Sequence, residues 1–129
     1  MNYYHSKILQ STSFEEAIDK VTEALKKEGF GILTEIDVKV TLKKKLDVNF
    51  RPYRILGACN PPFAHKALQA ENKIGIMLPC NVVVQETENG EIEVAAVNPV
   101  ASMSAVENIE LTGIAEEIKE KLERVIASL

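Results

Sequence analysis

The sequence predicts an α+β fold of two layers, in which a mainly antiparallel sheet carries helices on one face. Helix patterns are too few and too unevenly spaced for a doubly wound parallel sheet. An Asn89-Gly90 pair also separates two extended segments, a strong signal for a tight antiparallel hairpin. The 129 residues fit one domain, spanning residues 1–129, because two independent cores would be cramped at this length.

The N-terminal part of the chain predicts a strand followed by an amphipathic helix. Residues 3–9 form the strand, and Ser13 begins a capping box with Glu16. Apolar residues then recur with helical spacing, and Gly29 is a natural helix stop. The inward stripe consists of Phe14, Ile18, Val21 and Leu25.

The next segment predicts a second strand over residues 30–36, followed by a short helix. Alternation places four residues on one face of that strand: Phe30, Ile32, Thr34 and Ile36. Asp37 suits the N-cap of a helix that runs to Leu46, with Val38, Leu42 and Leu46 facing inward. The lysines at 43–45 form a solvated face.

A third strand is predicted over residues 53–59, and small residues near its end permit close approach of another segment. Asn60 is expected to cap the following helix, whose first turn holds Pro61 and Pro62. Residues 74–86 then predict the longest extended segment. Pro79 cannot donate to a strand ladder, so it marks an edge, a bulge or a break there.

Residues 91–97 return as the partner strand of the hairpin, and Asn98-Pro99 starts a helical C-terminal region. The long strand before the hairpin is apolar on both faces near Met77 and Val83. A sheet covered by helices on one face should be polar on the other unless something covers it. A second copy of the chain is the simplest cover, so we expect a homodimer formed through the sheet face.

Charge and composition exclude several classes of protein. Fifteen Lys and Arg against nineteen Asp and Glu give a net charge of -4, which argues against nucleic-acid binding. No apolar run approaches the roughly 20 residues that cross a bilayer, and no signal peptide is evident, so we expect no membrane association. Two cysteines do not make a disulfide framework. A cytoplasmic protein with reduced thiols is expected.

Two Cys-Asn pairs, Cys59-Asn60 and Cys80-Asn81, mark the place where chemistry could occur. They would converge if their strands were neighbours. One interpretation is a structural or interaction module, in which both cysteines are small buried residues. A second is a pocket for a small molecule or an anion, lined by helix-start amides, asparagines and Cys59. A third is a thiol or metal enzyme, in which Cys59, Cys80 and His65 hold a divalent metal.

The stretches Tyr53–Pro61 and Leu78–Val84 resemble a bacterial and archaeal family catalogued as domain of unknown function 302. The motif match comprises Gly57, Cys59, Asn60, Pro61, Pro79, Cys80 and Asn81. The resemblance implies a strand, a helix, four strands and a helix, similar to the TATA-binding-protein class of folds, and implies homodimers. It implies no activity and no catalytic residue. Two departures are Asn98, where the family often has Asp, and Asp47, where it often has Gly.

Overall fold

The computed structural model describes residues 2–129 and contains one five-stranded antiparallel sheet. The strand order across the sheet is β1-β5-β4-β3-β2. This arrangement confirms the predicted α+β class and the antiparallel pairing. The strands are β1 (Tyr4–Leu9), β2 (Gly31–Asp37), β3 (Tyr53–Cys59), β4 (Cys80–Glu86) and β5 (Ile92–Val97).

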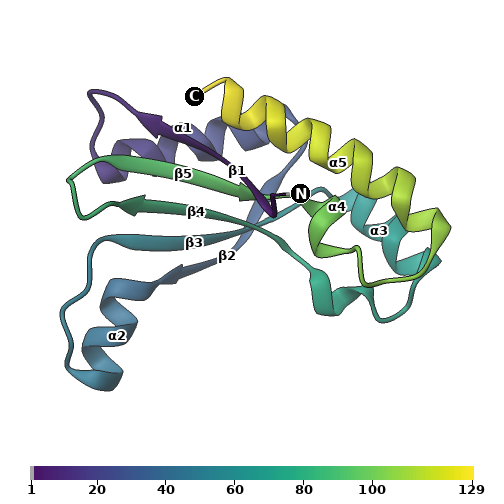
Figure 1. Cartoon of the computed structure of the whole chain (residues 1–129), viewed down its shortest axis with the longest axis horizontal. Helices are drawn as coiled ribbons and strands as arrows, with labels where there is room; N and C mark the ends of the chain where they lie inside the picture. The colour runs from purple at the N-terminus through teal and green to yellow at the C-terminus, as the bar shows by residue number, and fades with distance from the viewer. Residues whose placement is uncertain (1) are drawn as a thin grey trace.

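Two long helices, α1 (Phe14–Lys27) and α5 (Ile109–Ala127), cover one face of the sheet (Figure 1). Three short helical segments gather at one end of the sheet, and α2 (Val38–Leu46) lies beyond the other end. The short segments are α3 (Pro61–Ala70), the 3₁₀ helix η1 (Ile74–Met77) and α4 (Pro99–Ser102). Within residues 2–129, no helix has the length and apolarity needed to cross a bilayer.

The core lies between the sheet and the two long helices. Val82, Val84 and Val94 project from the strands and are completely buried, as are Leu25 and Leu122 from the helices. A second buried cluster continues past the end of the sheet and consists of Ala67, Ile74, Met103, Leu111 and Ala115. Helix α5 contributes to both clusters, so it joins the sheet to the short helices.

Local signals at two helix starts behave as predicted. Ser13 Oγ accepts a hydrogen bond from the Glu16 amide at 3.1 Å, and Asp37 Oδ1 accepts one from the Val40 amide at 3.0 Å. Each bond satisfies a backbone donor that the first helical turn leaves free. Gly90 takes the positive φ of +79° that the hairpin turn requires.

The prediction of one extended segment over residues 74–86 is wrong in its first part. Residues Ile74–Met77 form the 3₁₀ helix, the Leu78–Pro79 peptide bond is cis, and β4 begins only at Cys80. Ile74 is buried against the short helices, whereas Ile76 is exposed. Alternating apolar residues fit a strand equally well, and Pro79 provides the break that its missing N–H favours.

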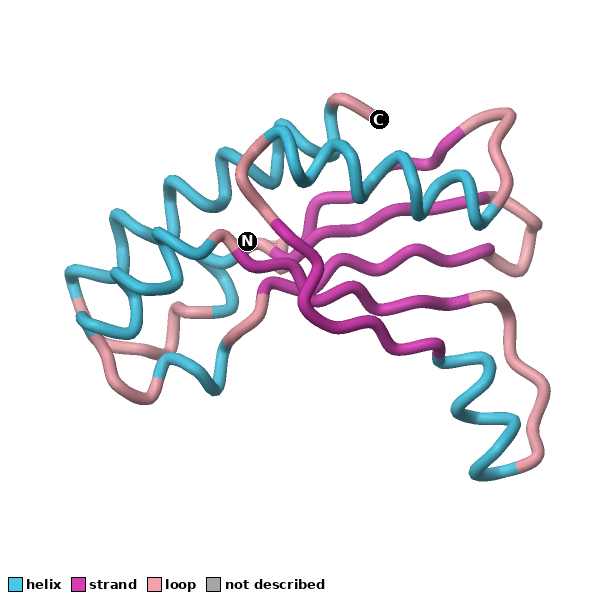
Figure 2. The backbone as a smooth tube through the Cα atoms, turned by 180° about the vertical axis from the view of Figure 1, so that it is seen from behind, coloured by secondary structure: helices cyan, strands magenta, loops and turns pink. Residues whose placement is uncertain are grey.

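The inward stripe expected for α2 is also wrong. Helix α2 buries no residue, and Leu46 is exposed. The helix starts directly from the end of β2 and projects away from the sheet, on the side opposite α1 and α5 (Figures 1 and 2). Contact with β2 and β3 therefore covers Val38 and Leu42 only in part, and Leu46 has no such cover.

The second strand does not keep the single face predicted for it. The pairing of β2 with β3 shifts between Ile32 and Thr34, which inserts a bulge at Leu33. Phe30 is buried, whereas Ile36 is about half exposed on the opposite side. One inserted residue reverses every side chain that follows it, because the side-chain period of a strand is two.

Candidate functional site

The two Cys-Asn pairs meet where the neighbouring strands β3 and β4 end and begin. Strand β3 pairs with β4 so that Ala58 lies opposite Cys80 and Gly57 lies opposite Asn81. Cys59 ends β3, and Asn60 follows as the N-cap of α3. Twenty residues separate Cys59 from Cys80 in the sequence, but the pairing of β3 with β4 makes the two segments adjacent in space.

Beside this junction lies an apolar cavity of about 280 Å³. It opens where the sheet ends and the short helices begin, between α3, α5 and the bulge of β2. Asn60 is the single amide among the described residues that line it, and no charged side chain contributes. The walls are Phe30, Leu33, Ala58, Cys59, Asn60, Phe63, Ala64, Ala67, Leu68, Leu78, Pro79, Cys80, Pro99, Met103, Ile114, Ala115 and Ile118.

Asn60 has a different role from the predicted capping one. Its side chain makes no cap hydrogen bond; instead, Nδ2 donates to the carbonyl oxygen of Glu28 at 3.1 Å. This bond ties the start of α3 to the end of α1. Pro61 and Pro62 have no N–H, so the first turn of α3 offers few amides to an anion. The helix start therefore does not favour the anion site that the sequence left open.

Gly57 and Asn81 belong to the motif but do not line the cavity. A Cβ atom on Gly57 would clash with Thr34 Oγ1 and would lie 2.7 Å from Pro79 Cγ. Gly57 is therefore required for close packing of β2 against the turn before β4. Asn81 is exposed and borders a groove on the uncovered face of the sheet.

Both cysteines are free thiols and half-buried. Burial, and after it the neighbouring Cys59, raises the pKa of the Cys80 thiol to about 11. At neutral pH Cys80 is therefore a neutral, weakly polar wall of the cavity. It lacks the electropositive surroundings that activate a catalytic thiol.

His65, the third predicted metal ligand, is not brought to the cysteines. It lies exposed on α3 and is absent from the cavity walls. Across residues 2–129 the structure places no three His, Cys, Asp or Glu side chains where they could hold a metal ion. The geometry thus brings Cys59 and Cys80 together and leaves the metal interpretation without a third ligand.

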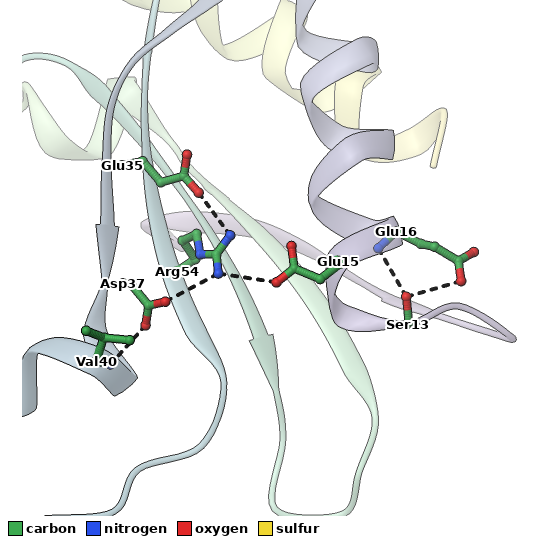
Figure 3. A network of polar contacts seen from close by, with 7 residues as sticks. All are labelled: Ser13, Glu15, Glu16, Glu35, Asp37, Val40 and Arg54. Atoms are coloured by element: carbon green, nitrogen blue, oxygen red, sulfur yellow. Dashed lines mark hydrogen bonds and ion pairs between the residues drawn. The ribbon is translucent and has the colours of Figure 1, made fainter. Parts of the chain in front are cut away.

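A polar cluster that the sequence reasoning missed lies at the other end of the sheet (Figure 3). Arg54 contacts Glu35 at 3.0 Å, and Glu15 and Asp37 at 3.3 Å each. Burial lowers the pKa of Arg54, but these three carboxylates outweigh it and raise the pKa above its usual value. The cluster ties α1 to β2 and β3, and its carboxylates are already paired. Strand alternation could not reveal the cluster, because only the bulge at Leu33 turns Glu35 and Asp37 to the helix-covered face beside Arg54.

The uncovered face of the sheet carries a second hollow, a groove of about 410 Å³. Strand alternation directs Ile55, Val83 and Ala95 to this face, opposite the buried core residues. Tyrosines from β1 and β3 border it. No helix within residues 2–129 covers this face, because α1 and α5 both pack on the other (Figure 2).

A family model described as "Domain of unknown function DUF302" matches residues 5–129. The chain therefore belongs to this family. It is also similar to a solved structure described as an uncharacterized conserved protein DUF302 from Bacillus stearothermophilus. That likeness has a TM-score of 0.90 at 30% identity and covers 98% of each chain. No curated protein matches this sequence.

Proposed function

We propose that this protein is a binding domain for a small apolar molecule, held in the cavity beside Cys59 and Cys80. The cavity itself carries the proposal: its volume of about 280 Å³ lies near the lower end of small-molecule sites, and its walls are almost entirely apolar. Asn60 supplies one fixed polar group on the wall, held by its bond to Glu28. The half-buried cysteines border this space, whereas a purely structural role would enclose both in aliphatic side chains.

A neutral fluorescent probe, 1-aminonaphthalene, tests this function directly, because its two fused rings are close to the size of the cavity. We expect saturable binding with a blue-shifted emission, because the probe moves from water into an apolar site. Ala64→Phe should fill the cavity from its α3 wall and leave no space for the probe. Binding should weaken at least about tenfold, which corresponds to a loss of ~1.4 kcal/mol of binding free energy. Ala127→Phe, at an exposed position on α5, is the matched control.

Circular dichroism of both variants shows whether each remains folded. Probe binding that is absent from the wild-type protein would contradict the proposal. Binding that survives in folded Ala64→Phe would place the probe outside this cavity.

We further propose that two copies associate through the uncovered face of the sheet, in the reducing environment of the cytoplasm. Ile55, Val83 and Ala95 give this face an apolar centre. Helix α2 supports the same assembly, because it projects on that side of the sheet and leaves Val40 and Leu46 exposed. A second copy would remove both apolar surfaces from water.

Native mass spectrometry at micromolar concentration tests the assembly. We expect a dimer for the wild-type chain and a monomer for Val83→Asp, which places a charge at the centre of the uncovered face. Ile109→Asp adds the same charge at an exposed position on α5 and should remain a dimer. A monomeric wild-type protein would overturn this part of the proposal.

A further inference from the structure

Two lysines lie beside the cavity at Phe63. Lys66 Nζ lies 5.3 Å from the centre of the Phe63 ring, and Lys121 Nζ lies 5.7 Å from the same centre. Phe63 is a half-buried wall of the cavity, so its ring borders both the apolar space and the solvent. Two ammonium groups from different helices, α3 and α5, therefore flank one edge of the site.

These two lysines are available for a ligand. Neither ammonium group has a carboxylate oxygen within 4.0 Å among residues 2–129. Glu28 is the carboxylate that Lys121 influences, but Arg124 already binds it through two hydrogen bonds of 3.2 and 2.9 Å. The bond from Arg124, followed by the charges of Arg124 and Lys121, lowers the pKa of Glu28 despite some burial.

The size of the cavity limits the apolar part of the ligand. At the ~30 Å³ that a water-sized group occupies, a volume of about 280 Å³ accommodates roughly nine non-hydrogen atoms. This corresponds to a medium-length hydrocarbon chain or a bicyclic ring. An acidic group cannot enter with it, because the walls offer no cation and burying an unpaired charge is costly.

We propose that the natural ligand is an amphipathic anion of medium chain length, with its apolar body in the cavity and its acidic group at Lys66 and Lys121. This inference rests on the proposed function and specifies its ligand class. The lysine stems can bring both ammonium groups to one carboxylate, since each is a flexible chain already packed on the Phe63 ring.

Three ligands with the same eight-carbon chain isolate the contribution of charge: octanoate, octanol and octylammonium. Each is titrated against protein loaded with 1-aminonaphthalene. We expect octanoate to displace the probe about three- to tenfold more tightly than octanol, because two exposed ion pairs contribute modestly. Octylammonium should bind weakest. The octanoate preference should shrink at 1 M salt, which screens exposed charges.

The double variant Lys66→Met and Lys121→Met should bind octanoate and octanol equally. The control, Lys44→Met and Lys45→Met, makes the same change in net charge on exposed α2 and should keep the preference. Equal binding of all three ligands by the wild-type protein would overturn this inference and leave the apolar cavity function standing. Failure of the probe itself to bind would overturn the proposed function instead.

Discussion

Gly57 occupies a position in β3 where the sheet leaves no room for a side chain. We expect Gly57→Ala to destabilise the fold by about 1–3 kcal/mol, because its Cβ would overlap Thr34 and press on the rigid ring of Pro79. Urea denaturation measures the change. Gly31→Ala, in the neighbouring strand, meets nothing within 4 Å and should be neutral or stabilising by up to ~1 kcal/mol. Equal effects at the two positions would refute the packing argument.

Cys80 should remain a thiol far above neutral pH. Its pKa of about 11 exceeds the ordinary value of 9.0, first because of burial and then because of Cys59. A Cys59→Ser variant leaves Cys80 as the single thiol and keeps burial, the larger cause of its raised pKa. Alkylation of Cys80 by iodoacetamide should be slow at pH 8 in this variant and should accelerate only above pH 9.0. The folded state binds the proton more tightly than the unfolded chain does. The resulting stability is therefore fully present below pH 9.0 and is lost as pH rises through about 11.

Asp47 is a non-glycine residue with a positive φ at the end of α2. It ends α2 with φ 53° and ψ 37°, in the left-handed region where glycine meets no steric penalty. Asp is among the few other residues that adopt this conformation routinely. Its carboxylate also lies 2.8 Å from Lys43 Nζ. Asp47 thus ends α2 in the left-handed conformation without a glycine.

At the scale of elements, α5 is the helix on which both parts of the core depend. Leu122 is completely buried between α1 and the sheet. We expect Leu122→Ala to lower the free energy of unfolding by about 2–5 kcal/mol, through lost apolar burial and the cavity left behind. Ile109→Ala, on the same helix but exposed, should cost under about 0.5 kcal/mol. Chemical denaturation of both variants provides the test.

Three asparagines connect the starts of helices to distant parts of the chain. Asn60 donates to the carbonyl of Glu28, Asn98 to that of Asn2 at 3.0 Å, and Asn108 to that of Ala70 at 2.8 Å. Asn98 and Asn108 also cap their own helices, because each Oδ1 accepts a backbone hydrogen bond. Asparagine can do both because its amide is donor and acceptor at once. An Asp carboxylate at position 98 could accept the capping bond but could not donate to Asn2.

Elements set by neighbouring residues were predictable from the sequence, and those set by pairing partners were not. The N-cap at Ser13 and the turn at Gly90 depend on a few adjacent residues, and both are confirmed. The capping box is completed differently from the prediction, because Glu16 accepts from the Ser13 hydroxyl. The bulge at Leu33 and the exposure of α2 depend on what lies opposite in space. The 3₁₀ helix at Ile74–Met77 was missed because alternation fits more than one backbone.

The candidate site was predictable in part for the same reason. Repetition of Cys-Asn indicated that Cys59 and Cys80 belong together, and their strands are indeed adjacent. The bond from Asn60 to Glu28 and the exposure of His65 could not be predicted, because both depend on how α3 is oriented against the rest of the molecule. The cavity is formed by residues from six segments of the chain, and no local pattern reveals such an enclosure.

At the scale of the whole molecule, the two apolar clusters should unfold together. They share α5, and the cavity lies between them, so neither cluster is complete without that helix. We expect far-UV circular dichroism and tyrosine fluorescence to give the same midpoint in urea at one protein concentration. Tyr53 reports on the sheet, while helices dominate the dichroism signal. Two separate midpoints would show that residues 1–129 are not one cooperative domain.

The bulge at Leu33 limits how molecules of this protein can associate edge to edge at high concentration. Strand β2 is an outer strand, and a regular outer strand is a template for continuous, fibre-like growth from molecule to molecule. The register shift between Ile32 and Thr34 interrupts the row of backbone donors and acceptors that such growth needs. One extra residue thus protects the chain against open-ended polymerisation, while leaving the broad flank of the sheet free for closed pairing.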